Sequence, residues 1–138
     1  MTGVIAVDAS VLIAILNRED EARHFLRTLN GARTVIGWPT MFEVRIWCVR
    51  RLGTFREPWL DGWIADSANR TMSFNGELER LASEAYQRFG KGRHPAALNF
   101  GDCMAYAVAA HHDAPLLFKG SDFARTDLQT HPASVALP

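Results

Sequence analysis

The chain has 138 residues, which suits one domain with a substantial core, and we expect residues 1–138 to form a single domain. Its 48% apolar and 22% charged residues are typical of a globular protein. The 15 basic residues balance the 15 acidic ones, so the net charge gives no general argument for binding to nucleic acid or membranes. Any nucleic-acid site must therefore be local.

The sequence favours a cytoplasmic protein with reduced cysteines that is not bound to a membrane. The apolar stretch at the N-terminus has no basic lead and is interrupted by Asp8, unlike a secretory signal. No stretch is long enough to span a bilayer. Cys48 and Cys103 both lie in apolar helical patterns, so we expect no disulfide framework.

The first half of the chain alternates strands and helices. The apolar run 3–7 predicts a buried strand, and residues 9–16 predict a helix, with Asp8 at the junction. A polar turn, an amphipathic helix over 21–29 and a second strand over 33–37 follow. A helix over 40–52 begins just after a proline and stops at a glycine.

The second half continues this alternation. Helices are predicted over 58–68 and 77–89, with a short strand over 70–74 between them. A loop over 90–95 leads into a helix over 98–110 that is apolar nearly all round and belongs inside the domain. A strand over 115–118 and a last edge strand over 134–137 follow. The order implies an α/β fold with a mostly parallel sheet and helices on both faces.

Four acids lie at the ends of apolar elements. Asp8 and Asp122 follow strands, whereas Asp102 and Glu43 lie near the starts of helices. Each also has an ordinary interpretation: a helix cap for Asp8 or Asp102, a turn residue for Asp122, and a surface acid beside an arginine for Glu43. If the first and fourth strands are neighbours, all four acids can converge at one edge of the sheet, where open α/β folds bind ligands.

Converging carboxylates indicate a metal site. Crowded carboxylates repel and raise one another's pKa, and a hard divalent cation with oxygen ligands relieves this. The sequence lacks a Cys/His zinc pattern, so Mg²⁺ or Mn²⁺ is favoured. Two such ions would stabilise the attacking water and the leaving oxygen in phosphodiester hydrolysis.

Several polar residues flank these acids. The Ser10 hydroxyl either supports the same site or is an ordinary first-turn serine. Lys91 and Arg93 lie in the loop before the Asp102 helix, where they form either a solvated basic loop or contacts to an RNA phosphate backbone. Lys119, just after the fourth strand, is a third candidate for binding phosphate.

Four pieces of the chain, taken in order, carry a resemblance. They are VDASVLIAIL near the N-terminus, Glu43 in the second long helix, LNFGDCMAYAVA, and LLFKGSDF near the C-terminus. The ordered set spans most of the chain and resembles PIN-domain ribonucleases, most closely the VapC-type toxins of prokaryotic toxin–antitoxin pairs. Each piece alone is unspecific, so the order carries the resemblance.

The resemblance implies a PIN-like three-layer α/β/α sandwich, with the family's acidic quartet at Asp8, Glu43, Asp102 and Asp122. It also implies Mg²⁺- or Mn²⁺-dependent endonucleolytic cleavage of RNA, inhibition by a cognate VapB-type antitoxin, and a homodimer. Many relatives have asparagine at the position of Ser121. A serine keeps a polar oxygen there, so we expect Ser121 to support the site.

The resemblance also implies that the antitoxin lays a flexible segment over an apolar helical surface and places an arginine at the acids. The surface around Trp47, Trp59 and Trp63 is one candidate, although these side chains fit the core equally well.

Two other functions remain open. One is an acid-cluster phosphatase, against which Asp8 counts because it lacks a second acid two residues on. The other is a non-catalytic domain that keeps the fold for binding.

Overall fold

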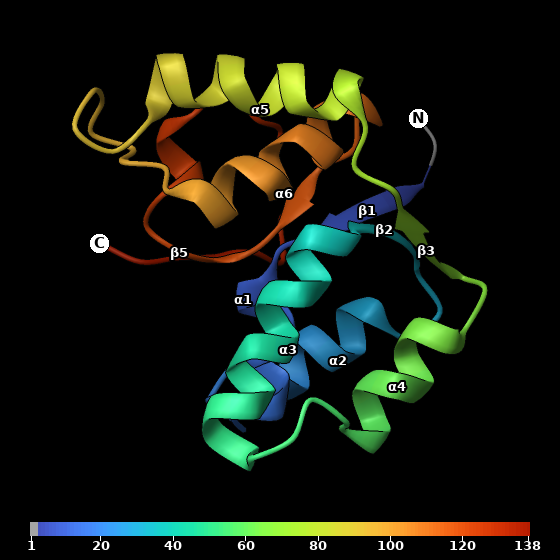
Figure 1. Cartoon of the computed structure of the whole chain (residues 1–138). Coiled ribbons are helices and arrows are strands. Elements are labelled where there is room, and N and C mark those ends of the chain that lie inside the picture. The colour runs from blue at the N-terminus through green and yellow to red at the C-terminus, as the bar shows by residue number, and fades with distance from the viewer. Residues whose placement is uncertain (1–2) are drawn as a thin grey trace.

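A parallel sheet of four strands runs through the middle of the molecule in the computed structural model, which describes residues 3–138 (Figure 1). The strand order is β3-β2-β1-β4, and every neighbouring pair is parallel. The strands are β1 (Val4–Val7), β2 (Arg33–Gly37), β3 (Asn69–Met72) and β4 (Leu116–Leu117).

Helices cover both faces of this sheet, which confirms the predicted three-layer α/β/α arrangement (Figure 1). One face packs against α5 (Gly76–Phe89) and α6 (Phe100–His111). The other packs against α1 (Ala9–Leu16), α2 (Ala22–Leu29), α3 (Trp38–Leu52) and α4 (Pro58–Ala65). The apolar helix α6 is buried along most of its length, as its sequence predicts.

The first and fourth strands are neighbours, the condition on which the predicted site depends. Ala6 pairs with Leu116 and Val7 with Leu117, and the amide of Asp8 donates to the carbonyl of Leu117 over 3.0 Å. The chain after β4 therefore leaves the sheet beside Asp8. It forms β5 (Lys119–Gly120), which pairs in parallel with β6 (Val135–Ala136) in a second small sheet.

The third strand begins earlier than predicted. Asn69 was expected to lie between a helix ending at 68 and a strand starting at 70, but it starts β3, and α4 already ends at Ala65. The reason is a buried polar network. The Asn69 side chain accepts a hydrogen bond from the Thr34 hydroxyl and donates to the carbonyl of Trp63, both over 2.8 Å. These contacts draw Asn69 into the sheet, because buried amide groups require partners.

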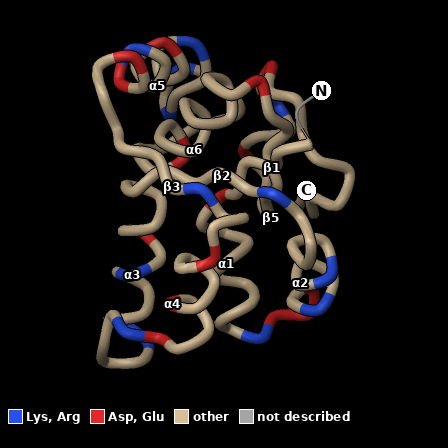
Figure 2. The backbone as a smooth tube through the Cα atoms, turned by 90° about the vertical axis from the view of Figure 1, so that its right-hand side faces the viewer, with Lys and Arg blue, Asp and Glu red and all other residues tan. Residues whose placement is uncertain are grey.

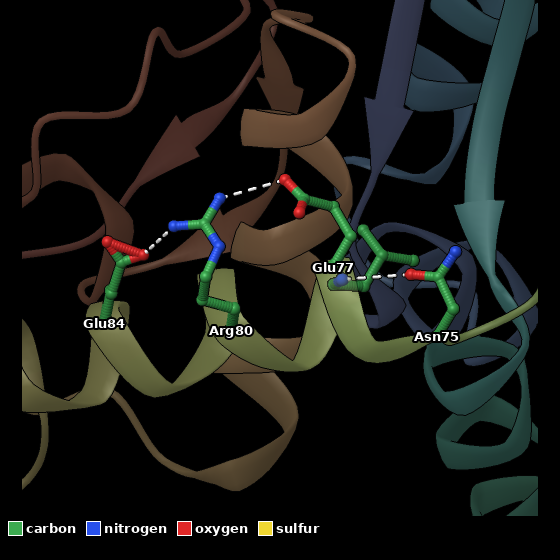
Figure 3. Close-up of polar contacts among 5 residues, drawn as sticks. Asn75, Glu77, Arg80 and Glu84 are labelled. Atoms are coloured by element: carbon green, nitrogen blue, oxygen red, sulfur yellow. Dashed lines mark hydrogen bonds and ion pairs between the residues drawn. The ribbon is translucent and has the colours of Figure 1, made fainter.

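Helix α5 shows how local chemistry fixes an outer helix (Figure 3). The Asn75 side chain caps it by accepting from the amide of Leu78 over 3.1 Å. Arg80 pairs with Glu77 at 2.9 Å and with Glu84 one turn further on. These exposed pairs each contribute only about 0.3–0.5 kcal/mol. Charges elsewhere also lie mainly on outer helices and loops (Figure 2).

Other expectations concern cysteines and membranes. Cys48 and Cys103 are both free and buried, as expected. None of the helices in residues 3–138 combines the length and the apolarity needed to cross a bilayer. A 3₁₀ turn, Phe123–Arg125, follows Asp122 and was not expected from the sequence.

Candidate active site

An open pocket of about 360 Å³ lies at the edge of the sheet where β1 and β4 end. All four predicted acids line it: Asp8, Glu43, Asp102 and Asp122. They come from four separate segments: the end of β1, helix α3, helix α6 and the turn after β5. The fold thus brings together carboxylates that are as much as 114 residues apart in the sequence (122 minus 8).

Asp8 is buried, with only 6% of its surface accessible, and it caps α1. Its Oδ2 accepts from the backbone amide of Ser10 over 3.2 Å and from the Ser10 hydroxyl over 2.6 Å. The same hydroxyl accepts from the amide of Lys119 over 2.9 Å. Ser10 therefore ties the carboxylate to β5. Burial raises the pKa of Asp8, and the hydrogen bonds from Ser10 partly oppose this.

Asp102 forms a capping box at the start of α6. Its amide donates to Asn99 Oδ1 over 2.9 Å, and its Oδ2 accepts from the amide of Asn99 over 3.0 Å. Burial raises the pKa of Asp102 to about 8, and the nearby carboxyl groups of Asp122 and Asp8 add to the shift. The residue is thus both a cap and a member of the pocket.

Glu43 belongs to the pocket and not to an ion pair. Burial raises its pKa, and the charge of Asp8 adds to the effect. No ion pair within residues 3–138 includes Glu43, and Arg45 pairs instead with Asp61 at 2.8 Å. This arrangement favours the functional interpretation over a surface acid beside an arginine.

Asp122 stands before the 3₁₀ turn without capping it through its side chain. Ser121 lies beside it, with its hydroxyl 3.3 Å from Asp122 Oδ1. Ser121 is exposed, whereas Asp122 lines the pocket. Ser121 thus contacts the carboxylate of Asp122, and its supporting role in the site stays a prediction.

The three predicted phosphate-binding residues lie in different settings. Lys119 lines the pocket, but its Nζ pairs with Glu19 at 2.5 Å and with Glu21 at 2.8 Å, and these contacts raise its pKa. Lys91 and Arg93 are exposed in the loop between α5 and α6. The Arg93 Nε donates to the carbonyl of Gln87 over 3.2 Å, which holds the side chain against α5.

The donor set of the pocket fits a hard divalent cation. Its acids supply only oxygen ligands, and the raised pKa values of Asp8, Glu43 and Asp102 indicate that the charged forms need compensation. Within residues 3–138, no three acidic, histidine or cysteine side chains lie close enough together to form a preformed metal site. The acids converge on the pocket without forming a finished coordination sphere.

Sequence reasoning missed two features of this site. Glu19 and Glu21, read only as part of a polar turn and a helix start, hold Lys119. Gly101 lies against the Glu43 carboxylate: a Cβ there would be 2.7 Å from Oε1 and 2.9 Å from Oε2. An isolated glycine inside an apolar helical pattern was the available signal for a close approach.

Comparison with known proteins agrees with this geometry. A model of the PIN domain matches residues 5–128. Ribonuclease VapC30 of Mycobacterium tuberculosis is 34% identical over 135 residues, covering 97% of this chain and 100% of that protein. Ribonuclease VapC36 of the same species is 38% identical over 125 residues, covering 89% and 90%. The chain therefore belongs to the PIN-domain family. Its relatives place it among the VapC-type toxins within that family.

Solved structures share the fold. The sarcin–ricin loop cleaving toxin VapC20 of Mycobacterium tuberculosis has a TM-score of 0.70 at 18% identity, covering 91% of this chain and 95% of that one. A chain of a toxin–antitoxin complex from Klebsiella pneumoniae has a TM-score of 0.67 at 17% identity, covering 97% and 100%. At these identities the likeness shows the PIN-like α/β/α sandwich.

Proposed function

We propose that this chain is the toxin of a toxin–antitoxin pair and cuts RNA internally at the acidic pocket with the help of Mg²⁺ or Mn²⁺. One observation carries the proposal: Asp8, Glu43, Asp102 and Asp122 reach a single pocket from four separate segments. The names of the relatives, which are VapC ribonucleases, support the reaction class. Residues 1–138 act as one nuclease domain.

The four carboxylates have different roles in binding the metal. Asp8 and Asp102 are the principal metal ligands, with Glu43 and Asp122 completing the set. When bound, the divalent cation activates water for attack on the phosphodiester and stabilises charge on the leaving oxygen. Ser10 keeps Asp8 in place through its 2.6 Å hydrogen bond. The capping box holds the Asp102 carboxylate at the start of α6, where it would help to bind the cation.

Lys91 and Arg93 contact phosphates of the RNA that approaches the start of α6. Both side chains are exposed and lie in the loop that leads into this helix. We assign Lys119 a smaller role, since Glu19 and Glu21 already neutralise its charge. Its contact with RNA depends on release from these two acids.

A VapB-type antitoxin silences the enzyme. We place its segment on the exposed apolar side of α3, where Phe42, Ile46, Val49 and Phe55 line a groove of about 400 Å³. The tryptophans considered for this role, Trp47, Trp59 and Trp63, are partly buried against the core between the sheet and α1–α4. Glu43 lies on the same helix as the groove, so a bound segment can continue toward the acids.

We also propose that the toxin acts on cytoplasmic RNA and forms a homodimer. Sequencing of RNA ends after induced expression tests the function. Expression of the parent should create new ends at defined positions, and Asp8→Asn should create none. If both proteins give the same ends, or neither gives any, RNA is not the substrate.

A further inference from the structure

Phe100 is the most exposed of the large apolar side chains described, with 79% of its surface accessible. It is the first residue of α6 and stands two positions before Asp102. The first position of a helix makes no demand for an aromatic ring, and Asn99 and Asp102 already supply the cap. A ring so fully in water suggests a partner that covers it.

The ring lines a groove of about 690 Å³ between α5 and α6. Ala82, Cys103 and Met104 give this groove an apolar lining, and Tyr86 adds a second aromatic ring. Lys91 also lines it, and among the ion pairs of residues 3–138 none uses this lysine. The groove therefore combines aromatic faces with a cation that makes no ion pair, and it also contains one acid, Glu79.

This groove and the acidic pocket lie on two sides of one helical turn. Asn99 and Phe100 line the groove, whereas Asp102 lines the acidic pocket. Cα atoms two residues apart on a helix are only about 5.4 Å from each other, on nearly opposite sides of its axis. A chain that lies across the start of α6 would thus reach both sites with neighbouring units.

We propose that the groove holds an unpaired nucleobase of the RNA, stacked on Phe100, while an adjoining phosphate lies at the acids. This inference rests on the proposed function. Aromatic faces beside a cation are the usual means of binding single-stranded RNA, because every base can stack and every nucleotide carries a phosphate. In addition, Asn99 uses only its side-chain oxygen in the cap, which leaves its amide N–H groups to meet the edge of a base.

The test uses the full chain and a single-stranded RNA that spans a mapped cleavage site, with 2-aminopurine placed at successive positions. Binding is measured in EDTA, so that cleavage is not needed for the readout. The variants are Phe100→Ala, Phe100→Leu and Phe100→Trp. Leu52→Ala is the matched control, since Leu52 is also an exposed large apolar residue, at 50%, and lines neither this groove nor the groove on α3.

The parent should change the fluorescence of 2-aminopurine at one position next to the cut. Phe100→Ala and Phe100→Leu should abolish this signal and weaken binding by about five- to hundredfold, whereas Phe100→Trp should keep both. The proposal is overturned if Phe100→Ala binds RNA as the Leu52→Ala control does. It is equally overturned if Phe100→Leu matches the parent, since stacking then contributes nothing.

A second copy of the chain is the competing occupant, and sedimentation of the same variants distinguishes it. If Phe100→Ala dissociates a dimer and leaves RNA binding unchanged, the ring packs against another protomer and the inference is wrong. Failure of the nuclease assignment would look different. If the parent cuts no RNA with Mg²⁺ but still shows the stacking signal in EDTA, the proposed base-binding groove stands and only the proposed nuclease activity is refuted.

Discussion

The carboxylate of Glu43 on α3 lies against the backbone of Gly101 on α6, so closely that a Cβ at Gly101 would meet three atoms of the carboxyl group within 2.9 Å. Because Gly101 has no side chain, the Glu43 side chain of α3 can lie directly against the backbone of α6 at the acidic pocket. The glycine immediately precedes Asp102, so the same contact sets the spacing of two acids of the site.

Gly101→Ala should displace the Glu43 carboxylate and lower the cleavage rate by about a hundredfold, since small misplacements of catalytic groups have such effects. Stability should stay within about 1 kcal/mol of the parent, because alanine favours the helix and the flexible end of Glu43 can move away. Cleavage kinetics and thermal unfolding measure the two quantities.

Gly62→Ala on α4 is the matched control, because nothing lies within 4 Å of a Cβ built there. It should leave cleavage unchanged and stabilise the fold by about 0.5–1 kcal/mol. Shortening the acid in Gly101→Ala/Glu43→Asp should recover part of the lost rate. Full activity in Gly101→Ala would show that the position of Glu43 is unimportant.

Asp8→Asn and Asp102→Asn should each lower cleavage on the order of a thousandfold without unfolding the domain. Asparagine caps helices about as well as aspartate at position 8, and at position 102 its side-chain oxygen can still accept from the amide of Asn99, so α1 and α6 keep their starts. Asp122→Asn should lower the cleavage rate by a smaller factor, because a water can take the place of its carboxylate. Circular dichroism and RNA cleavage assays check the two halves of this expectation.

The metal-free protein should become less stable as the pH rises. The pKa of Asp102 is raised from its ordinary 3.8 to about 8 in the fold. Between these values the folded chain binds a proton that the unfolded chain releases, so the stabilisation is complete below pH 3.8 and lost as the pH passes 8. Thermal unfolding in EDTA should show this decline, and Mg²⁺ should oppose it at high pH.

Asp102→Asn provides the comparison, since its amide does not titrate. Its unfolding free energy should fall less steeply with pH than that of the parent. A decline of equal steepness in both proteins would mean that Asp102 is not the group responsible.

Removal of Lys91 and Arg93 should weaken the salt dependence of RNA binding. Each lost phosphate contact lowers the slope of log binding constant against log salt concentration by about one. The slope of the double alanine variant should therefore be smaller by about two. Arg80→Ala removes a charge from the outer side of α5, where Arg80 is paired with Glu77 and Glu84, and should leave the slope unchanged. An unchanged slope in the double variant would rule out the loop.

The antitoxin should compete with the metal if it places an arginine at the acids. Glu43→Gln and Asp102→Asn should then weaken the toxin–antitoxin complex, since each removes a charge that pairs with a guanidinium. Glu84→Gln on α5 serves as the control. Equal antitoxin affinity in all these proteins, with or without Mg²⁺, would show that inhibition works by covering the RNA-binding surface instead.

Local patterns were enough for much of the fold. Helix α1 and strand β2 have the predicted bounds, because each is a run of apolar residues ended by polar residues or glycine. The four acids could be predicted because a carboxylate at the end of an apolar element stands out in the sequence. The convergence of the acids required β1 and β4 to be neighbours. The sequence could not establish this pairing, and the structure shows it.

Contacts between distant residues could not be predicted from patterns. Lys119 is paired with an acid 100 residues earlier, and no local signal links the two positions. The early start of β3 depends on hydrogen bonds between Asn69 and residues on other elements, one accepted from Thr34 and one donated to Trp63. The close approach of Gly101 to Glu43 likewise depends on how α3 crosses α6.

The most direct test of the central claim is RNA cleavage by the purified protein with Mg²⁺, compared with EDTA and with Asp102→Asn. The account predicts new internal RNA ends with the parent and Mg²⁺, and none in EDTA or with a folded Asp102→Asn. Cleavage that persists in EDTA, or that Asp102→Asn retains at the parent's rate, would contradict a metal-dependent nuclease built on these four carboxylates.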